Sequence, residues 1–305
     1  MWIAAVLFAL ALVFVYITAF VVAVRLFRNG KTARASLIDR AILILAGIGA
    51  LCFAYGRFIE PNRLVTTHVE IRSVKIPRNT RPIRIAHFSD LHVEEFPRLE
   101  STLVQAVSSA HPDVIVFTGD TLNVAEGLPL ARQTISALAK VAPTYVVRGN
   151  WDVDNWFQLD LFGGTGGHEL NGDTLKVDVA GTPIWIAGLA FDNSRALKNT
   201  IRSIPSGQFS ILLYHSPDLM SEAAEAHVDL YCAGHTHGGQ VAMPLYGALV
   251  TLSKFGKRYE RGLYHEKDTT LYVNRGVGMA GGYLPRVRFW SSPELTLIDI
   301  SSVDK

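Results

Sequence analysis

Cysteine and charge are both scarce in this sequence. The chain has two cysteines, Cys52 in an apolar N-terminal stretch and Cys232 in an expected core strand, so a disulfide between them is not expected. Cysteine usage therefore does not indicate a compartment. Charged residues make up 18% of the chain against 49% hydrophobic residues, a composition that is apolar for a soluble protein and indicates membrane segments.

The larger part of the chain also lacks a basic cluster. Residues 1–59 carry six basic side chains and one acidic side chain, a net charge of +5, whereas the whole chain carries +2, which leaves −3 for the remainder. A mildly acidic body without a basic patch argues against nucleic acid as a partner.

Two long apolar stretches lie at the N-terminus. Residues 2–24 hold no charged side chain over 23 residues, which is enough to span a bilayer. A secretory signal peptide is the alternative, but a basic N-terminal region and a small-residue cleavage site are both missing. Residues 41–59 form the second stretch, interrupted only by Arg57, whose long side chain can reach the interface. Because this stretch is shorter and richer in glycine, a re-entrant or interfacial segment is its alternative.

Five basic residues separate the two stretches: Arg25, Arg28, Lys31, Arg34 and Arg40. Short basic loops stay on the cytoplasmic side of a membrane. We therefore expect residues 1–59 to form a membrane anchor with two transmembrane segments. Both the N-terminus and everything after residue 60 would then lie on the extracytoplasmic side of the cell membrane.

Strands alternate with helices in the rest of the chain. Residues 60–82 are expected to form a linker and an edge strand, and residues 83–305 one domain. The main expected strands are 83–89, 114–117, 144–147, 184–187, 209–214 and 228–232. The expected helices are 98–110, 128–141 and 216–226. This alternation predicts an α/β layered fold.

Side chains that suit metal ions follow the carboxyl ends of five expected strands. They are Asp90, His92, Asp120, Asn150, His215, His235 and His237. Loops converge at that edge of an open α/β sheet, and ligands bind there. Any one of these residues has an ordinary explanation as a turn former or a buried core group. Seven donors arriving together predict a metal site.

His235 and His237 lie between glycines, directly after the expected strand 228–232. Side chains two apart on extended backbone point to the same side, so both imidazoles can face one divalent ion. A polar turn with two incidental histidines is the alternative for this segment taken alone.

The order and spacing of these residues resemble the calcineurin-like metallophosphoesterase family. The family pattern runs Asp-x-His, Gly-Asp-x-x-Asp, Gly-Asn-His-Asp/Glu, a later His, and Gly-His-x-His. The resemblance covers residues 83 to about 300, and residues 262–264 and 273–278 look like its membrane-associated bacterial branch. It implies a layered β-sandwich flanked by helices, here preceded by two transmembrane helices.

The resemblance also implies two divalent metal ions. It assigns Asp90, His92, Asp120 and His237 to one ion. It assigns Asp120, Asn150, His215 and His235 to the other, so that Asp120 bridges the pair. Oxygen and imidazole donors without a thiolate suit Mn, Fe or Zn.

Such a pair of ions accounts for phosphoester hydrolysis. Two divalent ions about 3.5–4 Å apart can hold a phosphate and acidify a water, and the resulting hydroxide attacks phosphorus in line with the leaving group. Only two carboxylates, Asp90 and Asp120, oppose about four positive charges, so the surplus favours an anionic substrate. We expect a hydrolase of phosphoester or pyrophosphate bonds.

Two positions depart from the family pattern. Trp151 stands where most members carry a histidine that contacts phosphate, and an indole cannot deliver a proton to the leaving group. We expect either a good leaving group, as in a pyrophosphate or aryl ester, or a replacement acid such as Asp152 or His168. The candidate catalytic residues are thus Asn150, Trp151 and Asp152. Asn123 replaces an aspartate that supports the neighbouring loop, and its loss is expected to soften the site.

Two segments suggest a phosphorylated, lipid-linked substrate. Residues 156–162 are apolar for a segment beside a phosphate site, and residues 283–290 mix aromatics with Arg286 and Arg288. The apolar side chains can meet a lipid tail while either arginine binds a head-group phosphate. The alternative is that both segments simply pack in the core or on the membrane-proximal face. One class of family members cleaves an acylated UDP-glucosamine in the cytoplasm, which conflicts with the orientation expected above.

A non-catalytic relative that serves as a membrane scaffold or sensor is the second interpretation. Trp151 favours it, whereas the intact set of metal ligands argues against it. Metal content measured together with hydrolysis of a p-nitrophenyl phosphodiester separates the two.

Overall fold

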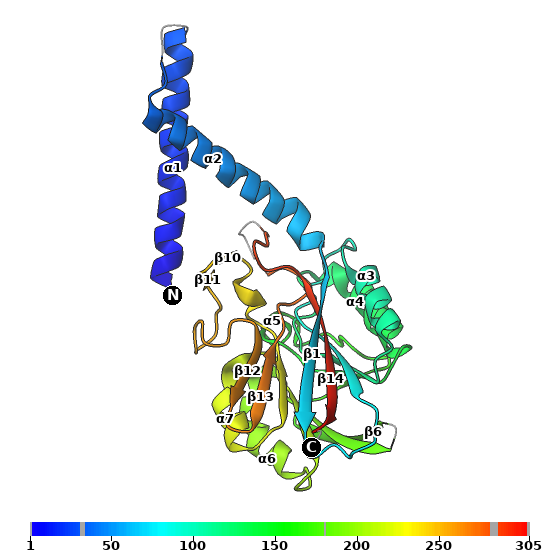
Figure 1. Cartoon of the computed structure of the whole chain (residues 1–305). Helices are drawn as coiled ribbons and strands as arrows, with labels where there is room; N and C mark the ends of the chain where they lie inside the picture. The colour runs from blue at the N-terminus through cyan, green and yellow to red at the C-terminus, as the bar shows by residue number, and fades with distance from the viewer. Residues whose placement is uncertain (1, 31–33, 180, 281–285, 304–305) are drawn as a thin grey trace.

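The computed structural model describes residues 2–30, 34–179, 181–280 and 286–303. Two long helices extend from a body made of stacked sheets with helices on the outside (Figure 1). Lys31 of the basic loop and residues 283–285 of the late aromatic segment lie outside the described residues.

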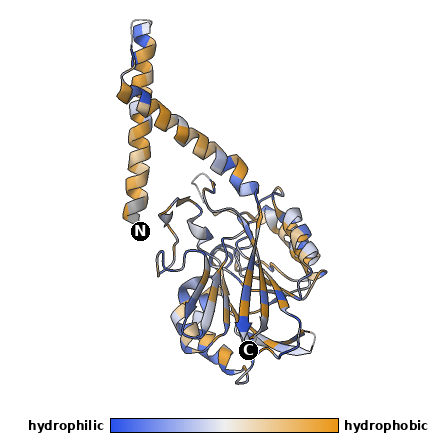
Figure 2. Ribbon diagram, viewed as in Figure 1, coloured by the Kyte–Doolittle hydropathy of each residue, from blue (hydrophilic) through white to orange (hydrophobic). Residues whose placement is uncertain are grey.

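The N-terminal helices are α1 (Trp2–Asn29) and α2 (Leu37–Ala54), the second continuing through a π-helical turn, η2 (Tyr55–Ile59), and a short 3-10 turn, η3 (Glu60–Asn62). Both helices are long and apolar enough to cross a membrane (Figure 2). Most of their large apolar side chains are exposed. Ser36 caps α2, and Asp39 in its first turn pairs with Arg25 of α1. The ends of α1 and α2 that this ion pair joins lie far from the body, whereas the start of α1 and the end of α2 lie near it (Figure 1).

Six strands form the first sheet, in the order β1-β14-β2-β3-β4-β5. Its strands are β1 (Val65–Ser73), β14 (Glu294–Ser302), β2 (Ile83–Phe88), β3 (Val114–Phe117), β4 (Thr144–Val146) and β5 (Gly167–Glu169). Strands β2 to β5 run parallel, and β14 is antiparallel to β2. The expected edge strand of the linker is therefore β1, which pairs with the last strand of the chain.

Six further strands form the second sheet, in the order β12-β13-β9-β8-β7-β6. They are β12 (Gly262–Glu266), β13 (Thr269–Val273), β9 (Leu230–Ala233), β8 (Phe209–Leu213), β7 (Thr182–Gly188) and β6 (Asp173–Val179). The four central strands, β13 to β7, are parallel, and the two edge strands are antiparallel to their neighbours. A small hairpin, β10 (Ala242–Met243) and β11 (Gly247–Ala248), follows the last predicted metal ligand.

The core lies between the two sheets. Ile85 and Val116 of the first sheet belong to the same buried cluster as Ile186 and Ile211 of the second. The outer face of the first sheet is covered by α3 (Glu100–Ala110) and α4 (Leu128–Ala139), and that of the second by α6 (Leu197–Arg202) and α7 (Met220–Glu225). Two sheets packed face to face with helices on both outer faces confirm the predicted layered α/β sandwich.

Candidate metal centre

The seven predicted ligands lie after strands of both sheets. Asp90 and His92 follow β2, Asp120 follows β3, Asn150 begins α5 (Asn150–Trp156) after β4, His215 follows β8, and His235 and His237 follow β9. Strands β2, β3 and β4 belong to the first sheet, and β8 and β9 to the second. The candidate centre therefore lies across the seam of the sandwich, at the carboxyl ends of its parallel strands.

Three of these side chains form a first compact group. Asp90 Oδ1 lies 3.2 Å from His237 Nε2 and 4.0 Å from His92 Nε2. The two imidazole nitrogens are 3.2 Å apart. One ligand atom from each residue lies within 4.8 Å of the other two, and all three residues are buried. This spacing suits a single cation held by one carboxylate and two imidazoles.

A second compact group shares Asp90 and adds Asp120 and His215. Asp120 Oδ2 lies 3.3 Å from His215 Nε2 and 3.6 Å from His92 Nε2, between a histidine of each group. Burial lowers the pKa of His215, but the carboxylates of Asp120 and Asp90 outweigh it and raise that pKa to about 9. A field that attracts a proton this strongly also attracts a divalent cation. Asp90 belongs to both groups, and Asp120 Oδ2 lies between a histidine of each, so both carboxylates lie between the two candidate ion positions.

The remaining two predicted ligands border this second group. The His235 ring lies edge-to-face with His215, its centroid 5.1 Å away, and its backbone N–H donates to Asp90 Oδ2 at 3.0 Å. His235 lies outside both compact groups. Asn150 adjoins Trp151, whose backbone N–H donates to Asp120 Oδ1 at 2.8 Å. The structure thus brings five of the seven residues into close groups and places His235 and Asn150 beside them.

Buried polar atoms without partners test whether these residues fit metal ions. Asp90 Oδ1, Asn150 Oδ1 and His215 Nε2 have no hydrogen-bond partner among the described residues. His215 Nδ1 lies 2.6 Å from the Thr118 carbonyl oxygen, so the proton of a neutral ring belongs on Nδ1 and the lone pair on Nε2. Leaving such acceptors buried and unmatched is costly. A cation satisfies all three, and the donor set fits divalent ions.

The backbone of the ligand loops is strained. Five predicted ligands have left-handed backbone, with φ of 51° at Asp90, 43° at His92, 61° at Asp120, 70° at His235 and 51° at His237. Residues with a side chain rarely adopt such φ values, and folded proteins concentrate this strain at functional sites. Their clustering at the ligand positions supports a built site at this edge.

Trp151 forms part of the wall of the centre. Its indole meets the His92 ring edge-to-face, with ring centroids 6.1 Å apart. Its Nε1–H is buried and has no acceptor among the described residues. An indole donor without a partner beside the metal ligands is available to a phosphate oxygen.

Asp152 lies behind the ligand loops. It is fully buried and accepts hydrogen bonds from the backbone N–H groups of Asp120 at 2.8 Å, Thr121 at 2.7 Å and Gly149 at 3.0 Å. Burial, followed by repulsion from Asp120, raises its pKa to about 6. Both carboxylate oxygens are engaged in joining the loops after β3 and β4, an arrangement that favours positioning of Asp120 over protonation of a leaving group.

We expect Asp152→Asn to weaken metal binding by about 10–100-fold, because an amide accepts hydrogen bonds at only one of its two polar atoms. Titration calorimetry with Mn²⁺ measures this change. Asp154→Asn, an exposed carboxylate on the same helix, is the matched control and should bind as the parent does. Unchanged metal affinity together with a lost basic limb of the pH–rate profile would instead assign Asp152 the role of an acid.

The two candidate substrate-binding arginines have different environments. The Arg288 side chain is fully buried and donates to the carbonyl oxygens of Gly278 at 3.0 Å, Ser291 at 2.8 Å and Arg275 at 2.9 Å. Burial lowers its pKa to about 9. One of its nitrogens also lies 3.3 Å from His237 Nδ1. Arg288 is therefore committed to backbone carbonyls behind His237 and has little freedom to bind a head group.

Arg286 faces a polar cavity that reaches the candidate centre. The cavity has a volume of about 420 Å³, and His92 and Arg57 also line it. Arg286 pairs with Glu94 at 2.6 Å on its wall. Sequence reasoning missed Arg57 as a site residue, because it read this arginine only as the snorkelling end of an apolar stretch. Its place between that stretch and the catalytic domain was the signal that could have found it.

Other predicted residues lie apart from the ligand groups. His168 lies within β5 and stacks on Tyr145, rather than following a strand as the ligands do. Leu161 and Phe162 are buried in the cluster beneath α3 and α4, so this part of segment 156–162 packs in the core. Phe157 is exposed. Asn123 donates to the Met279 carbonyl oxygen at 3.0 Å and ties its loop to the C-terminal part of the domain.

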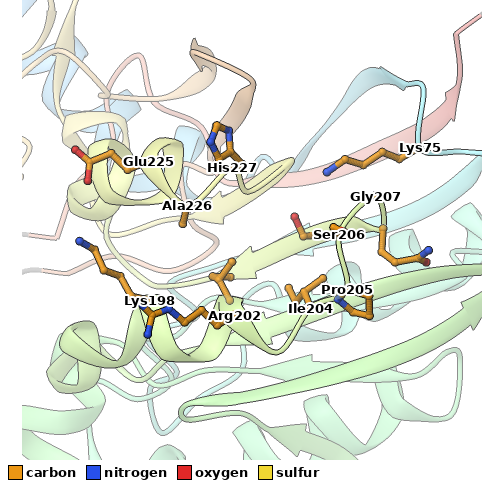
Figure 3. Close-up of a pocket in the computed structure, with 13 residues that line it drawn as sticks. Lys75, Lys198, Arg202, Ile204, Pro205, Ser206, Gly207, Glu225, Ala226 and His227 are labelled. Carbon is orange, nitrogen blue, oxygen red and sulfur yellow. The ribbon is translucent and has the colours of Figure 1, made fainter.

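A second cavity, of about 530 Å³, lies away from the candidate centre. Lys75, Lys198, Arg202 and Ser210 are among its lining residues (Figure 3). Ser210 lies near the start of β8, whereas His215 follows its end, so this cavity opens at the opposite edge of the sheet. None of the predicted ligands lines it.

Comparison with known proteins places this site in a family. A family model described as calcineurin-like phosphoesterase matches residues 83–239. The uncharacterized metallophosphoesterase YkuE of Bacillus subtilis is 32% identical over 264 residues, which cover 83% of this chain and 91% of YkuE. The phosphodiesterase YaeI of Escherichia coli is 27% identical, with 81% of this chain and 92% of YaeI covered. The UDP-2,3-diacylglucosamine pyrophosphatase LpxG of Chlamydia trachomatis is 24% identical, with 86% and 96% covered.

The family match contains every predicted ligand from Asp90 to His237. It also contains the strands β2, β3, β4, β8 and β9 that carry them. Members of the matched family hydrolyse phosphoesters with a dinuclear centre of divalent metal ions. This chain belongs to the calcineurin-like phosphoesterase family and is a metal-dependent phosphoester hydrolase.

Proposed function

We propose that the protein is a membrane-anchored phosphodiesterase or pyrophosphatase that acts on a lipid-linked substrate. The observation that carries the proposal is the polar cavity lined by His92, Arg286 and Arg57, because Arg57 belongs to the turn that ends the second apolar helix. A phosphate beside the metal ligands is thus also beside the candidate membrane anchor. The similarity to LpxG, whose name describes a diacylated substrate, agrees with this choice.

The residues of this chain supply binding, placement and exclusion of water. Two divalent ions, when bound, supply positive charge for the phosphate and lower the pKa of a water molecule. Asp90, His92, Asp120 and His237 would hold one ion. Asp120, Asn150, His215 and His235 would hold the other.

Trp151 and Arg286 complete the proposed phosphate site. The Trp151 Nε1–H can donate to a phosphate oxygen, and the Arg286 guanidinium adds positive charge on the side of the polar cavity. An indole N–H and a guanidinium do not act as proton donors to an alkoxide leaving group. We therefore propose that the natural leaving group is stable as an anion, as the leaving phosphate of a pyrophosphate is.

Hydrolysis by the full chain in detergent, loaded with Mn²⁺, tests this function. Methyl p-nitrophenyl phosphate is expected to be cleaved, and removal of the metal with EDTA should end the reaction until Mn²⁺ is restored. Bound metal without hydrolysis of this or any pyrophosphate-linked lipid would instead support the scaffold or sensor interpretation.

Trp151→His should make the enzyme less dependent on a good leaving group. A histidine here can protonate the departing oxygen, and general acids contribute about 10²–10⁴-fold to reactions with poor leaving groups. We expect the ratio of kcat/KM for p-nitrophenyl over alkyl phosphodiesters to fall at least about tenfold. Trp151→Phe, which keeps an aromatic side chain but lacks both the N–H and the second ring of the indole, should leave this ratio unchanged. The same ratio in all three proteins would show that position 151 does not govern leaving-group chemistry.

We propose that the catalytic domain lies on the extracytoplasmic side, because the basic loop lies at the other end of the two helices. Single cysteines placed at exposed positions test this orientation. With a membrane-impermeant maleimide on intact cells, Lys140→Cys in the domain should be labelled and Arg34→Cys in the loop should be protected. The reverse pattern would place the domain in the cytoplasm, where a nucleotide-linked lipid is available.

A further inference from the structure

An apolar cavity lies between the two N-terminal helices and the body. Its volume is about 450 Å³. Phe8 and Leu12 of α1, Cys52 and Phe53 of α2, and Val287 and Phe289 of the body form much of its wall. No charged side chain lines it among the described residues. The parts of both helices that border it are the ends nearest the body (Figure 1).

The segment 286–289 separates this apolar cavity from the candidate metal centre. Val287 and Phe289 line the apolar cavity, whereas Arg286 lines the polar cavity beside His92. Arg288 is buried between them, against His237. Successive side chains along the segment therefore lie toward opposite sides. It forms a wall with arginines toward the metal ligands and apolar side chains toward the helices.

Neighbouring residues at the end of the second helix also line different cavities. Gly56 lines the apolar cavity, and its neighbour Arg57 lines the polar one. Gly56 accepts a hydrogen bond from the Arg288 backbone N–H at 2.9 Å. A Cβ at Gly56 would lie 2.8 Å from the Arg288 carbonyl oxygen, so the close approach of helix and wall requires glycine here. The two cavities therefore adjoin along one packed seam.

We propose that the apolar cavity binds an acyl chain of the substrate, whose phosphate lies in the adjoining polar cavity beside His92. This inference rests on the proposed function and deepens it by naming the substrate class as an acylated phosphodiester or pyrophosphate. The lipid comes from the leaflet nearest the body, because the cavity lies between the body-side ends of two candidate membrane spans. Lipid acyl chains lie beside membrane-spanning helices, and the cavity is therefore within their reach.

The two cavities match the two parts of one amphiphile. Each methylene transferred into the apolar cavity should strengthen binding about fourfold. Arg57, Arg98 and Arg286 line the polar cavity and supply cationic groups for a phosphorylated head group, alongside Glu94 and Glu100. A helix from another chain would fill the apolar cavity but would not use the adjoining polar cavity.

Substitutions that fill the cavity test the proposal by a measurement that does not depend on enzyme activity. The full chain in nanodiscs is photolabelled with phosphatidic acid that carries a diazirine on its acyl chain, and labelled peptides are mapped by mass spectrometry. Label is expected on segment 286–289 in the parent protein. Cys52→Trp, and from the other side Val287→Trp, should reduce the label on Phe289 at least fivefold. Leu51→Trp, on the exposed face of the same helix, is the matched control and should leave it unchanged.

Hydrolysis adds a second readout. Hexadecyl p-nitrophenyl phosphate and its methyl analogue undergo the same reaction, in which water supplies the new oxygen on phosphorus and p-nitrophenol leaves. The parent should prefer the hexadecyl ester at least tenfold in kcat/KM, and Cys52→Trp should remove this preference, whereas Leu51→Trp should keep it.

The labelling experiment tests the acyl-chain site, and the hydrolysis experiment tests the proposed function, so failure of one can be distinguished from failure of the other. Labelling of Phe289 that Cys52→Trp does not change, or cross-linking of segment 286–289 to a second chain, overturns the acyl-chain site. A parent protein that hydrolyses neither ester overturns the proposed function, while the labelling still decides the cavity.

Discussion

Asp120→Ala is expected to abolish hydrolysis of methyl p-nitrophenyl phosphate and to lower the metal content of the purified protein. Asp120 Oδ2 lies 3.3 Å from His215 and 3.6 Å from His92, so the substitution removes a carboxylate oxygen placed between a histidine of each group. Loss of a single electrostatic donor from an active site costs about 10²–10³-fold in rate, and loss of a shared metal ligand should cost more.

Two measurements check this expectation together. Steady-state hydrolysis gives kcat/KM, and elemental analysis gives bound Mn per chain. Asp268→Ala removes a carboxylate whose side chain is 86% exposed and is the matched control, expected to behave as the parent does. Retention of both ions and of hydrolysis by Asp120→Ala would show that Asp120 does not bridge the centre.

Gly149→Ala should damage the centre almost as much, although it adds only one methyl group. The new Cβ would overlap the Asp120 carboxylate, with its nearest atoms at Asp120 Oδ1 and the Asp120 backbone nitrogen. Neither can retreat freely, because Asp152 and Trp151 hold the same loop through hydrogen bonds. We expect kcat/KM to fall at least about 10²-fold, the usual cost of displacing a catalytic group by about 1 Å.

Gly47→Ala is the control for this substitution, since its Cβ would meet nothing within 4 Å. Hydrolysis and the Mn²⁺ affinity of both variants are compared with those of the parent, and circular dichroism confirms that each is folded. A Gly149→Ala protein with the parent's Mn²⁺ affinity and rate would mean that the Asp120 loop is free to shift, contrary to the packing described here.

The ligands could be predicted from sequence because each follows a strand of simple pattern. Strands β2, β3 and β4 are short apolar runs, and Asp90, Asp120 and Asn150 come within a few residues of their ends. Local sequence is enough to place a side chain at the end of a strand. The parallel arrangement of those strands then brings the ends together without any knowledge of side-chain packing.

The roles of Arg288 and Asp152 could not be predicted in the same way. Arg288 is buried where the carbonyl oxygens of Gly278 and Ser291 accept its hydrogen bonds. The sequence around Arg288 does not show that these carbonyl groups lie next to it. The sequence places Asp152 beside Trp151 and makes it a candidate acid, but it gives no sign that the carboxylate accepts hydrogen bonds from the loop after β3. Both cases depend on tertiary contacts between loops rather than on the residue type.

The relation of the anchor to the centre is another long-range feature. The turn that ends α2 contacts the wall at residue 288, more than 200 residues later. Gly56 and Arg57 of that turn line the apolar and the polar cavity, respectively. The sequence indicated an amphiphilic substrate through residues 283–290, whereas the division of this segment into an arginine side and an apolar side required the structure.

Anomalous diffraction from crystals of the Mn²⁺-loaded full chain tests the central claim most directly. We predict two Mn peaks per chain, one among Asp90, His92 and His237 and one beside Asp120 and His215, with Asp120 contacting both. A single peak, or peaks that lie away from these side chains, would contradict the assignment of a dinuclear centre to this edge of the sandwich.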